Sequence, residues 1–212
     1  MNPIDTILFT ALLHKMGNSI ELMRKQVAQP HLVYSYRFDG QGGCLFKTDA
    51  SYMKFQANTL SVNTTEYPYM VCADITDFFN RISLHHLENA LRGMDLNDEA
   101  RILSTFLLSL SGGLSCGIPV GTAAARLLSE VILHGVDVTM CLTPDDIIYT
   151  RYNDDFRIFC KTVGTAHSFT TANQNHILRN WLHVATSKNN DRQNRSIPKR
   201  LAIYQQFDWF VS

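Results

Sequence analysis

Apolar and polar residues alternate with two different periods along the chain, and the period changes several times. Apolar residues at helical spacing predict one helix from Asn2 to about Leu13 and another from Ser19 to about Val27, which Pro30 ends. Further helices are predicted at 83–94, 97–110, 122–135 and 165–182.

Strand-like stretches lie between these helices. "YMVCA" at 69–73 is a short apolar run typical of a buried strand. "IIYTRY" and "FRIFC" are rich in β-branched and aromatic residues, and the residues from Asn153 to Asp155 between them suit a tight turn. Residues 31–68 mix strand-like pieces with the turn-rich "DGQGG". The order of strand, three helices, β-hairpin and helix predicts an α+β fold, with helices packed on a small antiparallel sheet.

Two adjacent carboxylates, Asp154 and Asp155, occupy the predicted hairpin turn. Like charges this close repel each other, and a divalent cation with oxygen ligands would remove that conflict. An isolated Asp-Asp pair is more often an ordinary solvated turn, so the pair alone does not establish a metal site.

Asp74 ends the buried strand, and Asp77 follows three residues later. A carboxylate at the end of a buried strand is unfavourable unless something pairs with it. Asp77 also fits a helix N-cap, whereas Asp74 fits that role poorly because the strand has only just ended. If this strand lies beside the hairpin, Asp74, Asp154 and Asp155 converge. Three carboxylates are the minimum for a two-metal site in phosphoryl or nucleotidyl transfer.

Composition narrows the class of protein. Lys and Arg together number 19, as do Asp and Glu, and this neutral balance argues weakly against a nucleic-acid binder. The segment 188–200 is basic and is either a phosphate-contacting segment or a solvated loop. No apolar run approaches the ~20 residues of a membrane span, and the N-terminus lacks the basic region of a secretory signal. The 5 cysteines form no C-x-x-C pair, so a reducing, cytoplasmic setting is expected.

Four segments in this order resemble motifs A to D of a reverse transcriptase palm: "VCADITDFFNRI", "GIPVGTAAARLLSEVIL", "RYNDDFRIF" and "WLHVATSKNN". Each motif is weak alone, but Tyr-x-Asp-Asp together with the strand-ending Asp74 upstream is a specific combination. "RYNDDFRIF" and "GIPVGTAAARLLSE" most resemble bacterial abortive-infection and defence-associated reverse transcriptases. The resemblance covers about residues 31–190 and implies a palm with a ferredoxin-like antiparallel sheet and packed helices.

The resemblance also implies how the chain is divided. Residues 1–68 would form a helical N-terminal segment and partial fingers, and residues 69–212 would form the palm, whose "QQFDWFVS" resembles the start of a primer grip. A thumb and the basic fingers region are lacking in the sequence. The chain would therefore be a fragment, or a protein partner or a second copy would supply these parts, which would also account for the neutral charge.

Carried over position by position, the resemblance implies two Mg²⁺ ions, with Mn²⁺ as the alternative metal. Asp74 and Asp154 would hold both ions, with Asp155 beside them and the main-chain carbonyl of Ile75 as a further ligand. Lys188 would be the motif D lysine that donates a proton to the pyrophosphate leaving group. The alternative for Lys188 is a solvated lysine in a polar loop.

The resemblance further implies a nucleotide-binding region around Phe79. Its ring would be the steric gate that excludes a ribose 2′-OH, so the substrate would be a dNTP; the alternative role is a core aromatic. Arg126 would contact template or nucleotide, unless it is an ordinary arginine on a helix surface. Gly121 would let the backbone approach the nascent base pair closely. The remaining positions flank the triphosphate or line the base pair: Asp77, Phe78, Pro119 and Val120.

The expected function is DNA synthesis, RNA-directed or untemplated, by a cytoplasmic enzyme of bacterial antiphage defence. Its partners would be an RNA template or a noncoding RNA, the DNA product and dNTPs, and no membrane. One alternative is a non-catalytic, palm-like subunit that binds RNA or assembles with another reverse transcriptase. Another is an RNA-dependent RNA polymerase or nucleotide cyclase on a similar palm, against which Phe79 argues. The group often has a small apolar residue where this chain has Asn153, a change expected to be tolerated.

Overall fold

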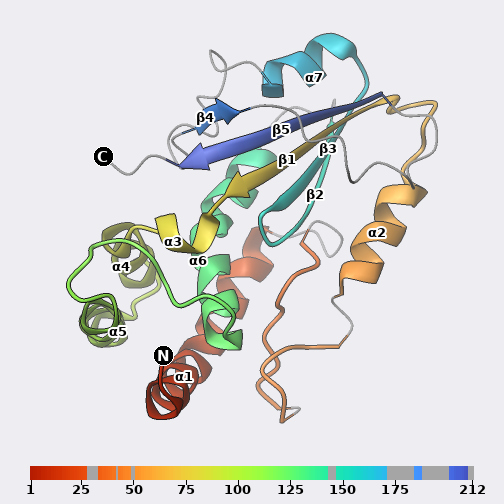
Figure 1. Cartoon of the computed structure of the whole chain (residues 1–212). Coiled ribbons are helices and arrows are strands. Elements are labelled where there is room, and N and C mark those ends of the chain that lie inside the picture. The colour runs from red at the N-terminus through yellow and green to blue at the C-terminus, as the bar shows by residue number, and fades with distance from the viewer. Residues whose placement is uncertain are drawn as a thin grey trace.

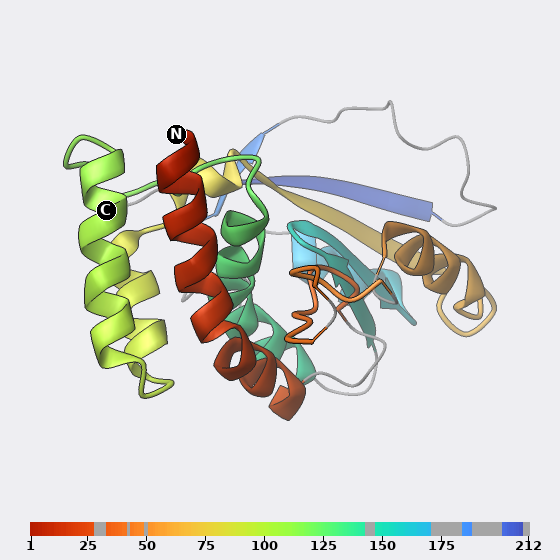
Figure 2. The same ribbon diagram turned by 90° about the horizontal axis from the view of Figure 1, so that it is seen from below.

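The computed structural model describes residues 1–27, 33–41, 43–48, 51–142, 147–170, 184–187 and 201–209. The helices are α1 (Pro3–Val27), α2 (Tyr52–Ser61), α3 (Phe78–Arg81), α4 (Leu84–Arg92), α5 (Asn97–Leu110), α6 (Ala123–Cys141) and α7 (Val163–Thr170). The strands are β1 (Tyr69–Thr76), β2 (Ile147–Tyr152), β3 (Asp155–Cys160), β4 (Val184–Ser187) and β5 (Leu201–Trp209). Both ribbon views place α2 at one side of the molecule and the α4–α5 pair at the opposite side (Figures 1 and 2).

The strands form one sheet in the order β2-β3-β1-β5-β4. β2, β3 and β1 are antiparallel neighbours, which confirms the predicted hairpin and the small antiparallel sheet of an α+β fold. β5 departs from the expectation of a wholly antiparallel, ferredoxin-like sheet, because it pairs parallel with β1 along its length. The sheet is therefore mixed, and β1 is a central strand with neighbours on both sides.

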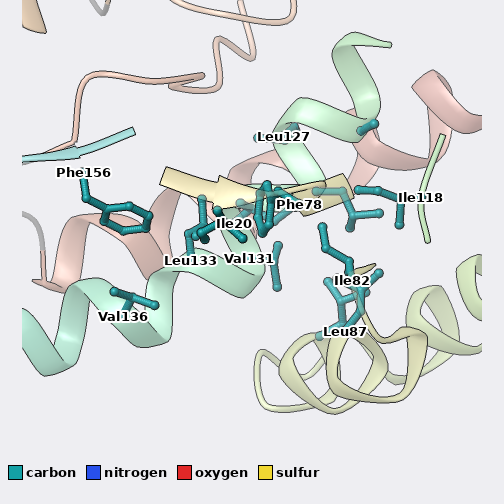
Figure 3. Close-up of a cluster of buried hydrophobic side chains, with 14 of the residues drawn as sticks. Ile20, Phe78, Ile82, Leu87, Ile118, Leu127, Val131, Leu133, Val136 and Phe156 are labelled. Atoms are coloured by element: carbon teal, nitrogen blue, oxygen red, sulfur yellow. The ribbon is translucent and has the colours of Figure 1, made fainter. Parts of the chain in front are cut away.

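The main hydrophobic core lies between one face of the sheet and α6. Helix α6 is apolar around most of its circumference, as expected for a helix buried on several sides. Figure 3 shows its residues Leu127, Val131 and Val136 among side chains from the hairpin, from α3 and from the loop that precedes α6. A second, smaller cluster, which includes Met70 and Phe159, lies on the other face of the sheet.

Helix α1 is continuous, although the sequence predicted two helices with a break near Gly17. Glycine usually weakens a helix, but here it serves close packing. A Cβ on Gly17 would collide with the ring of Phe38, which is itself buried. The apolar face of α1 also runs without a break through this region, since Leu13, Met16 and Ile20 are fully buried in the main core.

Other boundaries differ where tertiary contacts override the local pattern. Helix α2 lies within residues 31–68, for which the sequence predicted a mixture of strand-like pieces and turns. The Ser51 hydroxyl caps this helix by accepting a hydrogen bond from the backbone amide of Lys54. Helix α6 continues past Gly135 to Cys141 because Val136 and Met140 are buried. The predicted helix at 165–182 is described only as α7, and its remainder lies outside the described residues. No helix in the described ranges has both the length and the apolar character of a membrane span.

Candidate active site

The sheet brings the predicted carboxylates to one end of the hairpin. β1 pairs antiparallel with β3, and the last pair of this ladder is Ala73 with Phe156. Continuing the register by one residue places Asp74 opposite Asp155. Asp154 immediately precedes Asp155, in the turn that joins β2 to β3. Three acidic residues from two distant segments thus meet at the end of three neighbouring strands.

Alternation along the strands decides which way these side chains face. Ala73 and Ile75 belong to the main core on the α6 side, so Asp74 between them faces the other side of the sheet. Phe156 is also in the main core, so Asp155 faces away from α6 as well. We call the sheet face opposite α6 the outer face. Asp74 is exposed there and Asp155 is half-buried, so solvent reaches both carboxylates.

The three carboxylates perturb each other's protonation. Partial burial, and then the charges of Asp154 and Asp155, raise the pKa of Asp74 to about 6. Burial raises the pKa of Asp155 to about 6 as well; Asp154 adds to this shift and Arg157 opposes it. Burial also raises the pKa of Asp154, while a hydrogen bond from Asn153 opposes the shift. The site therefore carries closely spaced negative charge that is only partly neutralised by the protein.

The donor chemistry of this site fits a hard divalent cation. Carboxylate oxygens are the ligands that Mg²⁺ and similar ions prefer, and a cation would relieve the repulsion that raises the pKa of Asp74. The side chains do not form a finished cage: no three His, Cys, Asp or Glu residues in the described ranges are close enough to hold an ion. The residues thus supply suitable ligands that an ion would still have to draw together.

Arg157 forms a positively charged edge to the site. Its guanidinium lies 3.5 Å from the Asp155 carboxylate. The same group donates to the Thr59 hydroxyl at 2.6 Å and lies over the Phe55 ring, 4.2 Å from the centroid. Helix α2 therefore fixes Arg157 beside the carboxylates. The sequence did not indicate this role, because Thr59 and Phe55 are about a hundred residues away along the chain.

The segment that follows Asp74 turns back across the end of the sheet. The Ile75 side chain is buried in the main core, which leaves only its main chain for the predicted ligand role. Asp77 stands at the N-cap position of α3 with a left-handed φ of 56°, but its side chain makes no capping hydrogen bond. Instead, Asp77 Oδ1 accepts from the side-chain Nδ2 of Asn80 at 2.6 Å. Phe78 is buried, with 2% of its surface exposed, whereas Phe79 is only partly buried.

The loop before α6 packs onto this turn. The Ile118 amide donates to the Phe79 carbonyl at 2.9 Å, and the Gly117 amide donates to the Ile82 carbonyl at 2.8 Å. Val120 is 64% exposed. Gly121 has a φ of 89°, and a Cβ there would meet no protein atom within 4 Å, so its backbone conformation accounts for the glycine. The predicted nucleotide-binding residues are therefore brought into one region: Phe79, Pro119, Val120 and Gly121.

Arg126 lies in the first turn of α6 and is exposed. Its guanidinium sits over the Tyr36 ring at 5.6 Å from the centroid, and Tyr36 in turn packs against Tyr152 of the hairpin at 5.6 Å. Arg126 therefore lies near the hairpin instead of on a remote helix surface. Lys188, the predicted motif D lysine, lies outside the described residues.

Beneath the hairpin, four charged side chains form a buried cluster that the sequence did not reveal. We call Arg24, Glu130, Asp137 and Arg151 the buried ion cluster. Arg151 Nη2 lies 2.8 Å from Glu130 and 2.6 Å from Asp137, and Arg24 lies 3.1 Å from Glu130. All four are at most 4% exposed. The cluster joins α1, α6 and β2 directly behind the turn that carries Asp154.

A hint of this cluster was present in the sequence. Glu130 and Asp137 stand among the apolar residues of a helix that is otherwise buried, and Arg151 stands within an apolar strand. Buried charges are costly unless they are paired. Charged residues of opposite sign at core positions therefore predict that these residues pair with each other. Which helix charge meets which strand charge depends on the register of the two elements, and that register is set by the tertiary fold.

Replacing Asp74 with asparagine is expected to stabilise the fold. Because the pKa of Asp74 is raised to about 6 from 3.8, the folded chain binds this proton more tightly than the unfolded chain. Ionisation of Asp74 therefore costs stability as the pH rises from about 4 to 6, and the cost is fully present at pH 7. We expect Asp74→Asn to raise the free energy of unfolding at pH 7 by about 1 kcal/mol, a value discounted because the side chain is exposed.

Urea denaturation of both chains at pH 7 and pH 4.5 measures this effect. The gain should shrink at the lower pH, where the wild-type carboxyl is itself largely protonated in the folded chain. Asp98→Asn, at an exposed position in the first turn of α5, is the control and should show no such pH-dependent gain. A gain of the same size at both pH values would contradict the interpretation.

A helix-backed sheet with a carboxylate on a central strand and others at the adjacent hairpin turn is the arrangement that the resemblance to a reverse transcriptase palm implies. A comparison with protein families agrees: the family model for reverse transcriptase (RNA-dependent DNA polymerase) matches residues 13–197. The chain therefore belongs to the reverse transcriptase family, and the prediction of an RNA-directed DNA polymerase, a nucleotidyltransferase, is confirmed. Among curated proteins, none matches the chain.

Membership of this family carries two general consequences. A reverse transcriptase domain binds nucleic acid and dNTPs, and its chemistry generally uses divalent metal ions. The acidic outer face around Asp74 and Asp155 is compatible with such ions. The matched range begins within α1 and ends before β5, so the family model covers part of the N-terminal helix and strands β1 to β4.

Proposed function

We propose that the chain catalyses Mg²⁺-dependent DNA synthesis at the outer face of its sheet, with Asp74, Asp154 and Asp155 as the metal-binding residues. The supporting observation is that partial burial, and then the charges of Asp154 and Asp155, raise the pKa of Asp74 to about 6. They come from segments 80 residues apart, at positions 74 and 154, and share one end of the sheet. If these charges had no function, replacing one of the three carboxylates with a neutral side chain would only make the fold more stable.

In this proposal the three carboxylates and the Ile75 carbonyl would hold two Mg²⁺ ions, which would supply electrostatic stabilisation of the charge that develops in nucleotidyl transfer. The chain's own residues position the reactants. Asp77 and the main chain of Phe78 flank the triphosphate, since the Phe78 ring is buried in the core. Pro119, Val120 and Gly121 line the base pair, and Arg126 contacts template or nucleotide. Lys188 donates a proton to the leaving pyrophosphate.

Phe79 is proposed to select the sugar. The Phe79 side chain is partly buried, and the Phe79 carbonyl accepts a hydrogen bond from the loop before α6. The neighbouring Phe78 ring is buried in the core, and the centroids of the two rings are 5.4 Å apart. One ring of the pair is thus available at the site while the other supports the fold. A ring beside the ribose excludes a 2′-OH by steric overlap.

Phe79→Ala is expected to increase the preference for rNTPs over dNTPs by about 10- to 100-fold, the range that loss of a shaped contact produces. Single-nucleotide extension with matched dNTP and rNTP pairs gives the ratio of kcat/KM values. Phe78→Leu is the matched control: it should lower stability and leave the sugar preference unchanged. A wild-type chain that already prefers rNTPs would exclude the steric-gate role.

The proposal includes a cytoplasmic role in bacterial antiphage defence. "RYNDDFRIF" and "GIPVGTAAARLLSE" resemble defence-associated reverse transcriptases, and the 5 cysteines are all free, as in a reducing compartment. A protein partner or a second copy is proposed to supply further fingers and thumb surfaces. Copurified RNA and protein identify the partners, and phage plating on cells with and without the gene tests defence; equal plaque numbers would exclude it.

An extension assay tests the central activity. The purified chain receives an RNA template, a DNA primer, labelled dNTPs and Mg²⁺, and is expected to lengthen the primer. A parallel reaction without template separates templated from untemplated synthesis. A second reaction with EDTA in place of Mg²⁺ separates metal-dependent synthesis from contaminating activity. Tight RNA binding without any metal-dependent incorporation would favour the alternative of a non-catalytic RNA-binding subunit.

A further inference from the structure

The side chain of Asn153 occupies an unusual place between α6 and the acidic turn. Its backbone adopts a left-handed φ of 54°, which asparagine tolerates better than most residues. This conformation turns the side chain inward, and only 7% of the residue is exposed. No role was predicted for Asn153, because its position in Tyr-Asn-Asp-Asp is not that of a metal ligand.

The amide of Asn153 is hydrogen-bonded at both of its ends. Its Nδ2 donates to Asp154 Oδ1 at 2.6 Å, and its Oδ1 lies 3.1 Å from the Ser129 hydroxyl of α6. An ionised carboxylate only accepts hydrogen bonds, so the NH₂ group must face Asp154 and the amide oxygen must face Ser129. The Ser129 hydroxyl has one proton, which it shares between Asn153 and the Arg126 carbonyl at 2.9 Å.

The main chain of Asn153 is held as well. Arg151, a member of the buried ion cluster, donates from Nη1 to the Asn153 carbonyl at 3.3 Å. Arg151 is itself fixed by Glu130 and Asp137, both on α6. Backbone and side chain of Asn153 are therefore both tied to the same helix, and the only charged group that its amide contacts in the described residues is Asp154.

We propose that Asn153 is a positioning residue that orients the Asp154 carboxylate for divalent-metal binding and couples this orientation to α6 through Ser129. The proposal rests on the assignment of Asp154 as a metal ligand. Partners that hydrogen-bond to a ligand fix its orientation, and their loss commonly weakens metal binding 10- to 100-fold. A small apolar residue at this position would leave Asp154 to be oriented by its backbone alone.

Metal binding without nucleotide or nucleic acid provides the test. Mn²⁺, followed by electron paramagnetic resonance, serves as the probe for wild type, Asn153→Gly, Ser129→Ala and the double variant. Glycine is chosen at 153 because it accepts the positive φ without strain, so only the amide is lost. Asp95→Gly, at an exposed position with a φ of 60°, is the matched control for the same kind of backbone change.

We expect the Mn²⁺ dissociation constant to rise about tenfold in Asn153→Gly and roughly threefold in Ser129→Ala, with no change in Asp95→Gly. The double variant should be no weaker than Asn153→Gly, because Ser129 acts through Asn153. In extension assays the Mg²⁺ concentration for half-maximal rate should rise in Asn153→Gly, while kcat at saturating Mg²⁺ stays within about threefold of wild type.

Three results would overturn the inference: unchanged Mn²⁺ affinity in a folded Asn153→Gly chain, additive effects in the double variant, or wild-type Mn²⁺ binding that Asp154→Asn does not reduce. If Asn153→Gly does not fold, unchanged affinity in Ser129→Ala is decisive in its place. The Mn²⁺ measurement does not depend on catalysis. A chain that binds Mn²⁺ through Asn153-supported Asp154 but incorporates no dNTP would refute the proposed polymerase activity and leave this inference standing.

Discussion

Replacing Arg151 with methionine is expected to lower the free energy of unfolding by about 3–5 kcal/mol, the usual cost of removing one partner from a buried ion pair. Arg151 is fully buried and touches two carboxylates, Glu130 at 2.8 Å and Asp137 at 2.6 Å. Without it, Asp137 keeps the Tyr149 hydroxyl at 2.9 Å as a neutral partner, and Glu130 keeps Arg24. Two buried anions would then share one cation.

Protonation equilibria support the direction of this effect. Burial alone would raise the pKa of Glu130, but the charges of Arg151 and Arg24 outweigh it and hold the pKa below its usual value. The anion is therefore stable inside the protein only because both cations are present. The two terminal nitrogens of Arg24 already donate to the Ser35 and Tyr36 carbonyls, and only its Nε lacks a hydrogen-bond partner in the described residues, which limits how far Arg24 can replace Arg151.

Chemical denaturation of wild type and Arg151→Met measures the loss. The matched control is Arg92→Met, which breaks an ion pair with Glu88 of the same 2.6 Å length but with Arg92 50% exposed. That loss should stay within about 1 kcal/mol. Adding Glu130→Gln and Asp137→Asn to Arg151→Met should recover part of the stability, because the uncompensated charges are then removed. Equal losses for Arg151→Met and Arg92→Met would refute the role of burial.

The parts of the fold that the sequence predicted correctly are those with strong local signals. The hairpin was predictable because two β-branched and aromatic stretches flank Asn153 and Asp154, which suit a tight turn. The first part of β1 was predictable because its apolar run is short, but the predicted end at Asp74 was wrong, since the strand continues to Thr76 by pairing with β5. Helix α4 likewise begins after Ser83, whose hydroxyl accepts from the His86 amide as an N-cap.

The parts that the sequence did not predict depend on contacts between distant segments. Gly17 is a helix breaker by local propensity, yet it continues α1 because Phe38 needs the space above it. The parallel pairing of β5 with β1 has no local signal, since strand order is decided by connections across the whole chain. Arg157 and the buried ion cluster acquire their roles only when α2, α6 and the hairpin come together.

The candidate site also has features that the sequence predicted and features that depend on contacts between distant segments. The identities of Asp74, Asp154 and Asp155 follow from position in strand and turn, so they were predictable. Their mutual influence on pKa was not, because it requires the register of β1 against β3. The role of Asn153 was likewise hidden, since the direction of its amide depends on a positive φ and on a hydroxyl of α6.

Asp154→Asn is expected to lower the rate of dNTP incorporation by about 1,000-fold or more. Loss of a charged metal ligand removes several kcal/mol of transition-state stabilisation, and each 1.36 kcal/mol is a tenfold change in rate. Asparagine keeps the size of the side chain and accepts the hydrogen bond from Asn153, so the fold should persist. Unfolding measurements should therefore show a stability at least equal to wild type, because burial raises the pKa of Asp154 and disfavours its charge.

Primer extension under single-turnover conditions, with RNA binding measured in parallel, separates chemistry from assembly. RNA affinity should change little in Asp154→Asn, since the substitution removes negative charge from the site. Asp95→Asn is the control, because it neutralises an exposed acidic residue in the connection between α4 and α5 and should retain full activity. An Asp154→Asn chain that keeps more than a tenth of wild-type activity would show that the acidic turn is not the metal centre, and the search for the catalytic carboxylates would have to move away from the hairpin.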